Sequence, residues 1–248
     1  RDFKKDPAWE NFGNYLENEG NRYMLNGQPR NAYFVEYREG IYVGYRYYET
    51  RAYTEGNSAY TGKINGTDTT EWDSWYDAHV VYPFGYGLSY TDFEWKATAT
   101  VPEGTVLSAD GKLEFEVEVT NIGKLHEGKD VVQLYVSAPY YEGGIEKSHV
   151  KLVDFAKTET LDANGGKGKV TLSVDVRDLA SYDYDNANGN EVTGYEVEAG
   201  EYTFYISENA HSWNDSEGKV TAFSYSVPYG GFYYAEDDTS TAEEPREI

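Results

Sequence analysis

The stretch "KLEFEVEVT", residues 112–120, alternates apolar and acidic side chains along most of its length. In an extended chain, residues two positions apart lie on the same face, so the apolar side chains share one face and the glutamates share the other. The apolar face consists of Leu113, Phe115, Val117 and Val119. The pattern predicts a strand that covers a core on one side and meets water on the other.

Six more segments with this period of two lie between residues 93 and 228. They are "FEWKATATV" (93–101), "DVVQLYVS" (130–137), "HVKLVDFAK" (149–157), "KVTLSVDV" (169–176), "EYTFYIS" (201–207) and "VTAFSYSV" (220–227). In "HVKLVDFAK" the alternation places Val153 and Phe155 on the inner face. Glycine- and asparagine-rich turns such as "NIGK" and "ANGGKG" separate the segments. We therefore predict a mainly β fold, a seven-stranded immunoglobulin-like or fibronectin-III-like sandwich.

Residues 1–92 show a different pattern. "DPAWENFGNYL", which starts at Asp6, resembles the beginning of a helix, and the alternation in "GIYVGYRYYE" (40–49) predicts a strand. A long polar loop over residues 53–79 follows. Because residues 1–92 have too few apolar side chains for an independent core, we expect them to be the remnant of a larger domain. The acidic stretch 235–248 reads as a disordered tail or an interdomain linker.

The composition excludes several classes of partner. With 21 Lys and Arg against 44 Asp and Glu, the net charge is −23, which repels nucleic acid and anionic lipid surfaces. No apolar run approaches the ~20 residues that a membrane helix needs. We therefore expect no nucleic-acid partner and no membrane partner. The absence of cysteine fits a cytoplasmic or a secreted bacterial protein equally well, so the compartment stays open.

Several stretches, in this order, resemble the C-terminal half of glycoside hydrolase family 3 enzymes, chiefly β-glucosidases and β-xylosidases. They are "EGIYVGYRYYET" (39–50), "YPFGYGLSYTDFEW" (82–95), "VTNIGKLHEGKDVVQLYVSAP" (119–139), "RDLASYDYDN" (177–186) and "VEAGEYTFYISENAHSW" (197–213). The segment "PFGYGLSYT", Pro83 to Thr91, is the most specific of the motifs. The resemblance covers nearly the whole chain.

The resemblance implies a division of the chain. Residues 1–82 would be the last part of an α/β sandwich domain, 83–92 its exit linker, 93–228 a fibronectin-III-like domain, and 229–248 an acidic tail or interdomain linker. The family's nucleophilic Asp lies in a (β/α)8 barrel, and its acid/base Glu lies earlier in the α/β sandwich domain. The implied partners are the missing barrel and the rest of that domain, with a β-linked oligosaccharide or glucoside as the substrate of the complete enzyme.

No catalytic residue is assigned to this chain. Retaining glycoside hydrolysis needs two carboxyl groups about 5–5.5 Å apart, and neither family motif has a counterpart here. We expect that the chain alone does not hydrolyse an aryl β-glucoside. No cofactor and no metal is predicted, because the four histidines lack ligand spacing. "DYDNANGNE" (183–191) has the oxygen donors of a calcium loop, but the Gly189 spacing misses that of an EF-hand, and a plain polar loop is favoured.

The candidates for substrate contact are Trp72, Trp75 and Tyr76 in "EWDSWY" (71–76), because indole rings beside acids can stack on a pyranose ring and bind its hydroxyl groups. The alternative, that the two tryptophans cover an apolar patch of the parent domain, is favoured. Two classes of function follow from the sequence. One is a non-catalytic scaffold within a family 3 β-glycosidase, and the other is a stand-alone carbohydrate-binding or adhesion module.

Overall fold

The structure is a computed structural model. It describes residues 40–56, 76, 78–214 and 220–234, with short stretches at 14–15, 22–26, 28–31, 33–34, 63–64 and 67–68. The chain divides into two compact units, residues 1–82 and 83–248. Among the described residues, no helix combines the length and the apolar character needed to cross a membrane.

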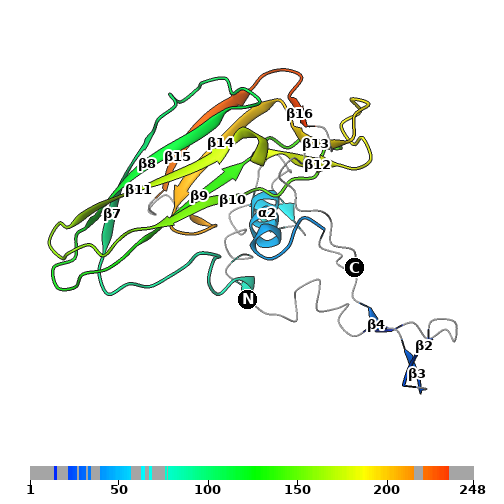
Figure 1. Ribbon diagram of the computed structural model, residues 1–248, viewed down its shortest axis with the longest axis horizontal. Helices are drawn as coiled ribbons and strands as arrows, with labels where there is room; N and C mark the ends of the chain where they lie inside the picture. The colour runs from blue at the N-terminus through cyan, green and yellow to red at the C-terminus, as the bar shows by residue number, and fades with distance from the viewer. Residues whose placement is uncertain are drawn as a thin grey trace. The chain divides into compact units, whose positions relative to one another are not determined.

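Two antiparallel sheets form the sandwich of the second unit (Figure 1). The four-stranded sheet has the order β10 (Lys151–Lys157), β9 (Val131–Ser137), β14 (Gly200–Ser207) and β15 (Val220–Val227). The three-stranded sheet has the order β11 (Lys167–Asp175), β8 (Lys112–Asn121) and β7 (Phe93–Ala99). All seven segments predicted from their period of two are strands, and the mainly β sandwich is confirmed.

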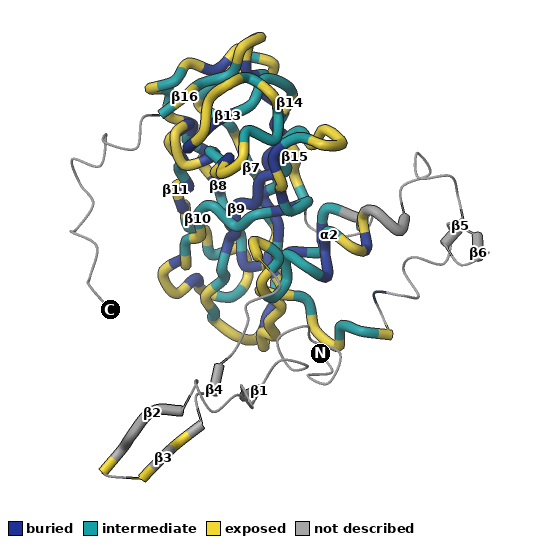
Figure 2. The backbone as a smooth tube through the Cα atoms, turned by 90° about the vertical axis from the view of Figure 1, so that its right-hand side faces the viewer, coloured by how far each residue is buried: buried dark blue, intermediate teal, exposed yellow. Residues whose placement is uncertain are grey.

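The core lies between these two sheets. Phe115 of β8 packs on Phe204 of β14 and Tyr225 of β15, with ring centroids 5.7 Å and 6.4 Å away. All three side chains are at most 1% exposed. Figure 2 shows buried residues, in dark blue, concentrated along the strands in the middle of the unit. The central strand β9 is buried on both faces from Val132 to Val136, so a second layer must cover its outer side.

A third sheet was not predicted. β13 (Gly194–Val197) pairs with β12 (Ser181–Asp183) on one side and β16 (Phe232–Tyr234) on the other, at one end of the sandwich (Figure 1). These strands have three or four residues each, too few to display a period of two. Two 3-10 turns, Val176–Leu179 and Ser212–Asn214, lie in connecting segments.

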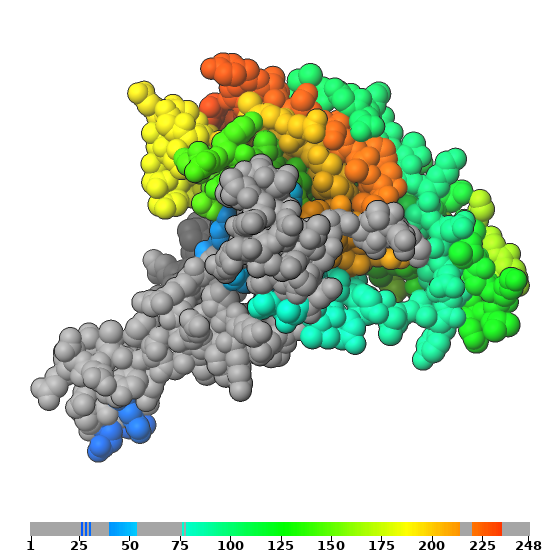
Figure 3. All heavy atoms as spheres, turned by 180° about the vertical axis from the view of Figure 1, so that it is seen from behind, coloured from blue at the N-terminus to red at the C-terminus, as the bar shows by residue number. Residues whose placement is uncertain are grey.

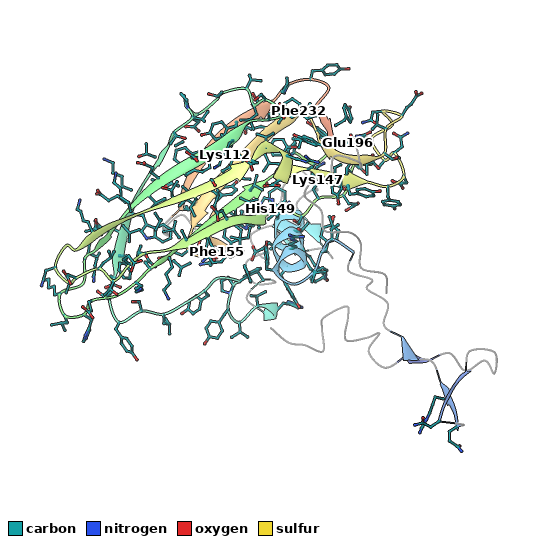
Figure 4. All side chains as sticks on the ribbon, viewed as in Figure 1. Lys112, Lys147, His149, Phe155, Glu196 and Phe232 are labelled. Atoms are coloured by element: carbon teal, nitrogen blue, oxygen red, sulfur yellow. The ribbon has the colours of Figure 1, made fainter. Side chains whose placement is uncertain are left out.

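The prediction that Phe155 (labelled in Figure 4) lies on the inner face is wrong, since its side chain is 63% exposed. A bulge between Leu152 and Asp154 shifts the register of β10 against β9. Val153 meets the core as predicted, but the extra residue reverses the alternation that follows, so Ala156 rather than Phe155 faces inward. The Asp154 carboxylate accepts a hydrogen bond from the backbone N–H of Ser173, at 2.7 Å.

The first unit contains a helix where a strand was predicted. α2 spans Tyr45–Gly56, so the strand prediction for residues 40–49 is wrong from Tyr45 onward. Gly44, at a φ of +64°, adopts the left-handed conformation just before the helix. Tyr48 and Ala52, four residues apart on one helix face, are 4% and 0% exposed. The buried positions of this tyrosine-rich segment therefore repeat with the period of a helix.

The remaining described elements of the first unit are short two-stranded pairings. β1 (Asn14–Tyr15) pairs with β4 (Tyr33–Phe34), β2 (Arg22–Leu25) with β3 (Gln28–Asn31), and β5 (Lys63–Ile64) with β6 (Thr67–Asp68). The helix predicted from Asp6 lies outside the described residues except at β1, which is extended. The acidic stretch 235–248 also lies outside them.

Candidate functional site

The predicted sugar-contact residues are only partly described. Trp72 and Trp75 lie outside the described residues, and their contact with a sugar stays a prediction. Tyr76 is 3% exposed and packs with Tyr48 and Ala52 of α2. Its hydroxyl group donates a hydrogen bond of 2.5 Å to Glu49 Oε1, and the Glu49 side chain is fully buried. In this chain Tyr76 therefore has the packing and the hydrogen bond of a structural tyrosine.

Within the part of the chain that the structure describes, no group of three or more His, Cys, Asp or Glu side chains is arranged to hold a metal ion. Glu49, beside Tyr76, is fully buried and does not meet solvent.

Residues 83–92, which we name the motif segment, are fixed to the second unit at both ends. At the first end, Phe84 O accepts a hydrogen bond from Ala210 N (2.8 Å), and Gly85 O accepts one from Gln133 Nε2 (3.3 Å). Gln133 Nε2 also donates to Glu208 O, at 2.5 Å. The motif segment thus supplies part of the layer that covers the outer face of β9.

At its other end, the motif segment is held by a buried asparagine. Thr91 Oγ1 donates to Asn121 Oδ1 at 2.5 Å, and Asn121 Nδ2 donates to the carbonyl oxygens of His126 and Leu161, each at 3.0 Å. Asn121 is fully buried and Thr91 is 7% exposed. Ile122 N also donates to Asp92 O, at 2.8 Å. Hydrogen bonds therefore hold the backbone of the segment at both of its ends.

Between these anchors the motif segment carries large apolar side chains into solvent. Phe84 and Tyr86 are 47% and 46% exposed, and Leu88 and Tyr90 are 88% and 94% exposed. We name these four residues the motif face. Exposed apolar side chains on a fixed backbone mark surfaces that contact another protein or domain. The motif face is the candidate functional site.

A histidine with an altered pKa packs against the loop that receives the motif segment. The ring of His149 meets the edge of Trp213 at a centroid distance of 4.3 Å, and His211 lies against the same indole at 5.7 Å (Figure 4 labels His149). Burial, reinforced by the nearby His211, lowers the pKa of His149 from 6.5 to about 3. His149 is therefore neutral in the folded chain near neutral pH.

Comparison with known proteins identifies the class of domain. Residues 130–210 match the family model described as a fibronectin type III-like domain. The chain is 38% identical to β-glucosidase A of Butyrivibrio fibrisolvens over 182 residues, which are 70% of this chain and 19% of the relative. The predicted resemblance to β-glucosidases is confirmed.

Solved structures agree with this result. A β-glucosidase from Paenibacillus barengoltzii matches 90% of this chain with 32% identity and a TM-score of 0.57. β-Glucosidase 3B from Thermotoga neapolitana, in complex with α-D-glucose, matches 78% of it with 32% identity and a TM-score of 0.51. The match covers 20% of each of those chains. This chain thus spans about a fifth of the length of these relatives.

Sequence reasoning identified the motif segment but not the residues that hold it. Gln133 interrupts the apolar run "VVQLYV", and Asn121 was read only as part of a turn. A polar side chain within a strand that is otherwise apolar on both faces is a usable signal, because a buried amide needs hydrogen-bond partners. The partners themselves, Gly85 and Thr91, are 48 and 30 residues away.

Proposed function

We propose that this chain is a non-catalytic part of a family 3 β-glucosidase and that the motif face contacts the catalytic domains of the longer protein. The observation that carries the proposal is a fixed backbone over residues 83–92 whose side chains at Leu88 and Tyr90 are almost fully exposed. Apolar side chains held in this way gain free energy when another surface covers them.

The comparisons support the same proposal. The relatives are β-glucosidases, and the chain corresponds to about a fifth of their length. One solved relative is in complex with α-D-glucose, which supports a terminal β-glucosyl residue as the substrate of the complete enzyme. The nucleophile and the acid/base would come from the barrel and from the remainder of the α/β sandwich domain.

The test is hydrolysis of p-nitrophenyl β-glucoside and β-xyloside. The chain is assayed alone and after mixing with a separately produced fragment of its parent that contains the barrel. We expect no turnover by the chain alone and turnover in the mixture above that of the barrel fragment by itself. Activity of the chain alone that survives repurification would overturn the proposal, and so would a barrel fragment whose activity the chain does not change.

The carbohydrate-binding alternative depends on Trp72 and Trp75, which lie outside the described residues. It predicts retention on a β-glucan affinity gel that Trp72→Ala or Trp75→Ala abolishes. Retention of this kind, together with no effect on the barrel fragment, would replace the scaffold proposal.

A further inference from the structure

Two buried acids lie at the base of the loop between β12 and β13, residues 184–193. Asp183, the last residue of β12, is 1% exposed, and Glu196 of β13 is 2% exposed (Glu196 is labelled in Figure 4). In the antiparallel pairing Ser181 lies opposite Glu196, and Asp183 lies opposite Gly194. The two acids therefore occupy diagonal positions on one face of the sheet, about 7 Å apart at their backbones and within side-chain reach.

Donors in the loop give two hydrogen bonds to one oxygen of each carboxylate. Asp183 Oδ1 accepts hydrogen bonds from the backbone N–H groups of Asp185 (3.3 Å) and Ala187 (2.9 Å). Glu196 Oε2 accepts hydrogen bonds from the side-chain Nδ2 atoms of Asn188 (2.9 Å) and Asn190 (2.8 Å). Each carboxylate is thereby fixed in orientation by two donors.

The second oxygen of each carboxylate has no such donor. Asp183 Oδ2 and Glu196 Oε1 are both buried, and neither has a hydrogen-bond partner among the residues that the structure describes. The ion pairs found in that part of the chain involve neither acid. A carboxylate oxygen that has lost its water and gained no partner is costly.

We propose that Asp183 Oδ2 and Glu196 Oε1 together bind a calcium ion, which fastens the 184–193 loop to the third sheet. A divalent cation supplies positive charge to two oxygens at once. Calcium suits this chemistry because it takes oxygen ligands only, tolerates irregular geometry and accepts water and backbone carbonyl groups as further ligands. Magnesium demands near-ideal octahedral geometry, and zinc prefers nitrogen and sulfur ligands.

The proposed calcium site differs from an EF-hand loop, with which the segment "DYDNANGNE" (183–191) shares its oxygen donors. In an EF-hand all ligands come from one 12-residue loop, with glycine at its sixth position. Here Gly189, with a φ of +71°, is the seventh residue counted from Asp183, and the two acids come from neighbouring strands. The loop, in yellow in Figure 3, projects from one end of the unit.

Calcium titration of the whole chain tests the proposal. The EDTA-treated protein is titrated with CaCl2 in 0.1 M KCl by calorimetry, and Tb³⁺ luminescence excited through nearby tyrosines gives a second readout. The variants are Asp183→Asn and Glu196→Gln. The matched control is Asp185→Asn, which removes the same charge from an exposed position in the same loop. The control is needed because a net charge of −23 attracts calcium diffusely.

We expect one saturable site with a Kd of about 1 mM or tighter, the range of extracellular calcium modules. Affinity should fall at least tenfold in both variants and change less than twofold in Asp185→Asn. Calcium at 10 mM should also raise the Tm of the unaltered chain by about 3 °C over KCl of equal ionic strength. This last measurement keeps the proposal testable if a variant does not fold.

Two results would overturn the proposal. One is the absence of a saturable isotherm together with an unchanged Tm. The other is equal calcium affinity in the unaltered chain, Asp183→Asn and Glu196→Gln, which would place the bound calcium elsewhere on the acidic surface.

Discussion

The side-chain amide of Gln133 ties the backbone of Gly85 to the centre of the four-stranded sheet. Gln133 Nε2 donates to Gly85 O at 3.3 Å, and Gln133 Oε1 accepts a hydrogen bond from the Tyr135 hydroxyl group at 2.7 Å. A single buried amide thus links the most specific motif of the sequence to the strand that lies deepest in the fold. The residues of this link can be tested one at a time.

Gln133→Leu should lower the free energy of unfolding by about 1–3 kcal/mol. Leucine keeps most of the volume but removes the donor to Gly85 O and the acceptor of the Tyr135 hydroxyl group, which leaves buried polar groups without partners. Urea unfolding measures the change. Thr171→Val, a polar-to-apolar change at an exposed position of β11, should stay within about 0.5 kcal/mol. Equal effects of the two variants would contradict the role given to Gln133.

Gly85→Ala should destabilise the second unit, whereas Gly87→Ala should not. Gly85 has a φ of +87°, and a Cβ atom there would lie 2.2 Å from Gln133 Oε1. Gly87 has no atom within 4 Å of its Cβ position and no positive φ. We expect a loss of about 1–3 kcal/mol for Gly85→Ala. For Gly87→Ala we expect a change near zero or a small gain. Thermal unfolding of the two variants side by side decides the matter.

Leu88→Ser and Tyr90→Ser should reduce activation of the barrel fragment without reducing stability. Their side chains are 88% and 94% exposed, so their loss removes little packing within this chain but shrinks the apolar area available to a partner. Tyr229→Ser, at a fully exposed tyrosine elsewhere, is the control. The assay is the concentration of chain that gives half-maximal turnover, and we expect it to rise about tenfold for the double variant. A rise that also occurs with Tyr229→Ser would point to a nonspecific effect.

His149 should make the chain less stable in mild acid. Because its pKa falls from 6.5 to about 3 on folding, the unfolded chain takes up a proton below pH 6.5 that the folded chain does not. The free energy of unfolding therefore decreases as the pH falls, by about 2 kcal/mol at pH 5 from this group alone. His149→Gln should remove that part of the decrease between pH 7 and pH 5. A pH profile of His149→Gln that matches the profile of the unaltered chain would contradict this role of His149.

The ion pair between Lys147 and Glu198 should be costly to break. Their side chains are 4% and 10% exposed, and Lys147 Nζ has a further contact with Ile145 O at 3.3 Å. Glu198→Gln leaves a buried ammonium group without its counter-charge, at a cost of about 3 kcal/mol in urea unfolding. The matched change is Glu159→Gln in the exposed pair with Lys129, where about 0.5 kcal/mol or less is expected.

The sandwich was predictable because its strands repeat one simple pattern. In β8 each inward residue from Leu113 to Val119 is at most 1% exposed, as the alternation of "KLEFEVEVT" requires. The same reasoning failed at Phe155, because a bulge changes which side chains of β10 face inward. A bulge cannot be recognised from the apolar pattern of a seven-residue strand. Short strands such as Ser181–Asp183 were missed because they contain too few residues to show any period.

The helix over Tyr45–Gly56 was misread for a different reason. Tyrosine is common in strands, and over ten residues a tyrosine-rich run fits a period of two as well as a period of 3.6. Only contacts with residues far along the chain, such as the bond from Tyr76 to Glu49, distinguish the two. The roles of Gln133, Asn121, Asp183 and Glu196 could not be predicted for a similar reason. Each role depends on which residues far along the chain, or on a neighbouring strand, lie beside the polar side chain.

The bulge in β10 also affects how readily this edge of the sheet could pair with a second copy of the chain. β10 ends the four-stranded sheet, and a straight strand in that position would offer unpaired N–H and C=O groups to a second molecule. The register shift between Leu152 and Asp154 interrupts that row of groups, and Lys151 and Lys157 place positive charge at its two ends. We therefore expect the irregularity that exposes Phe155 also to hinder pairing of this sheet edge with a second copy.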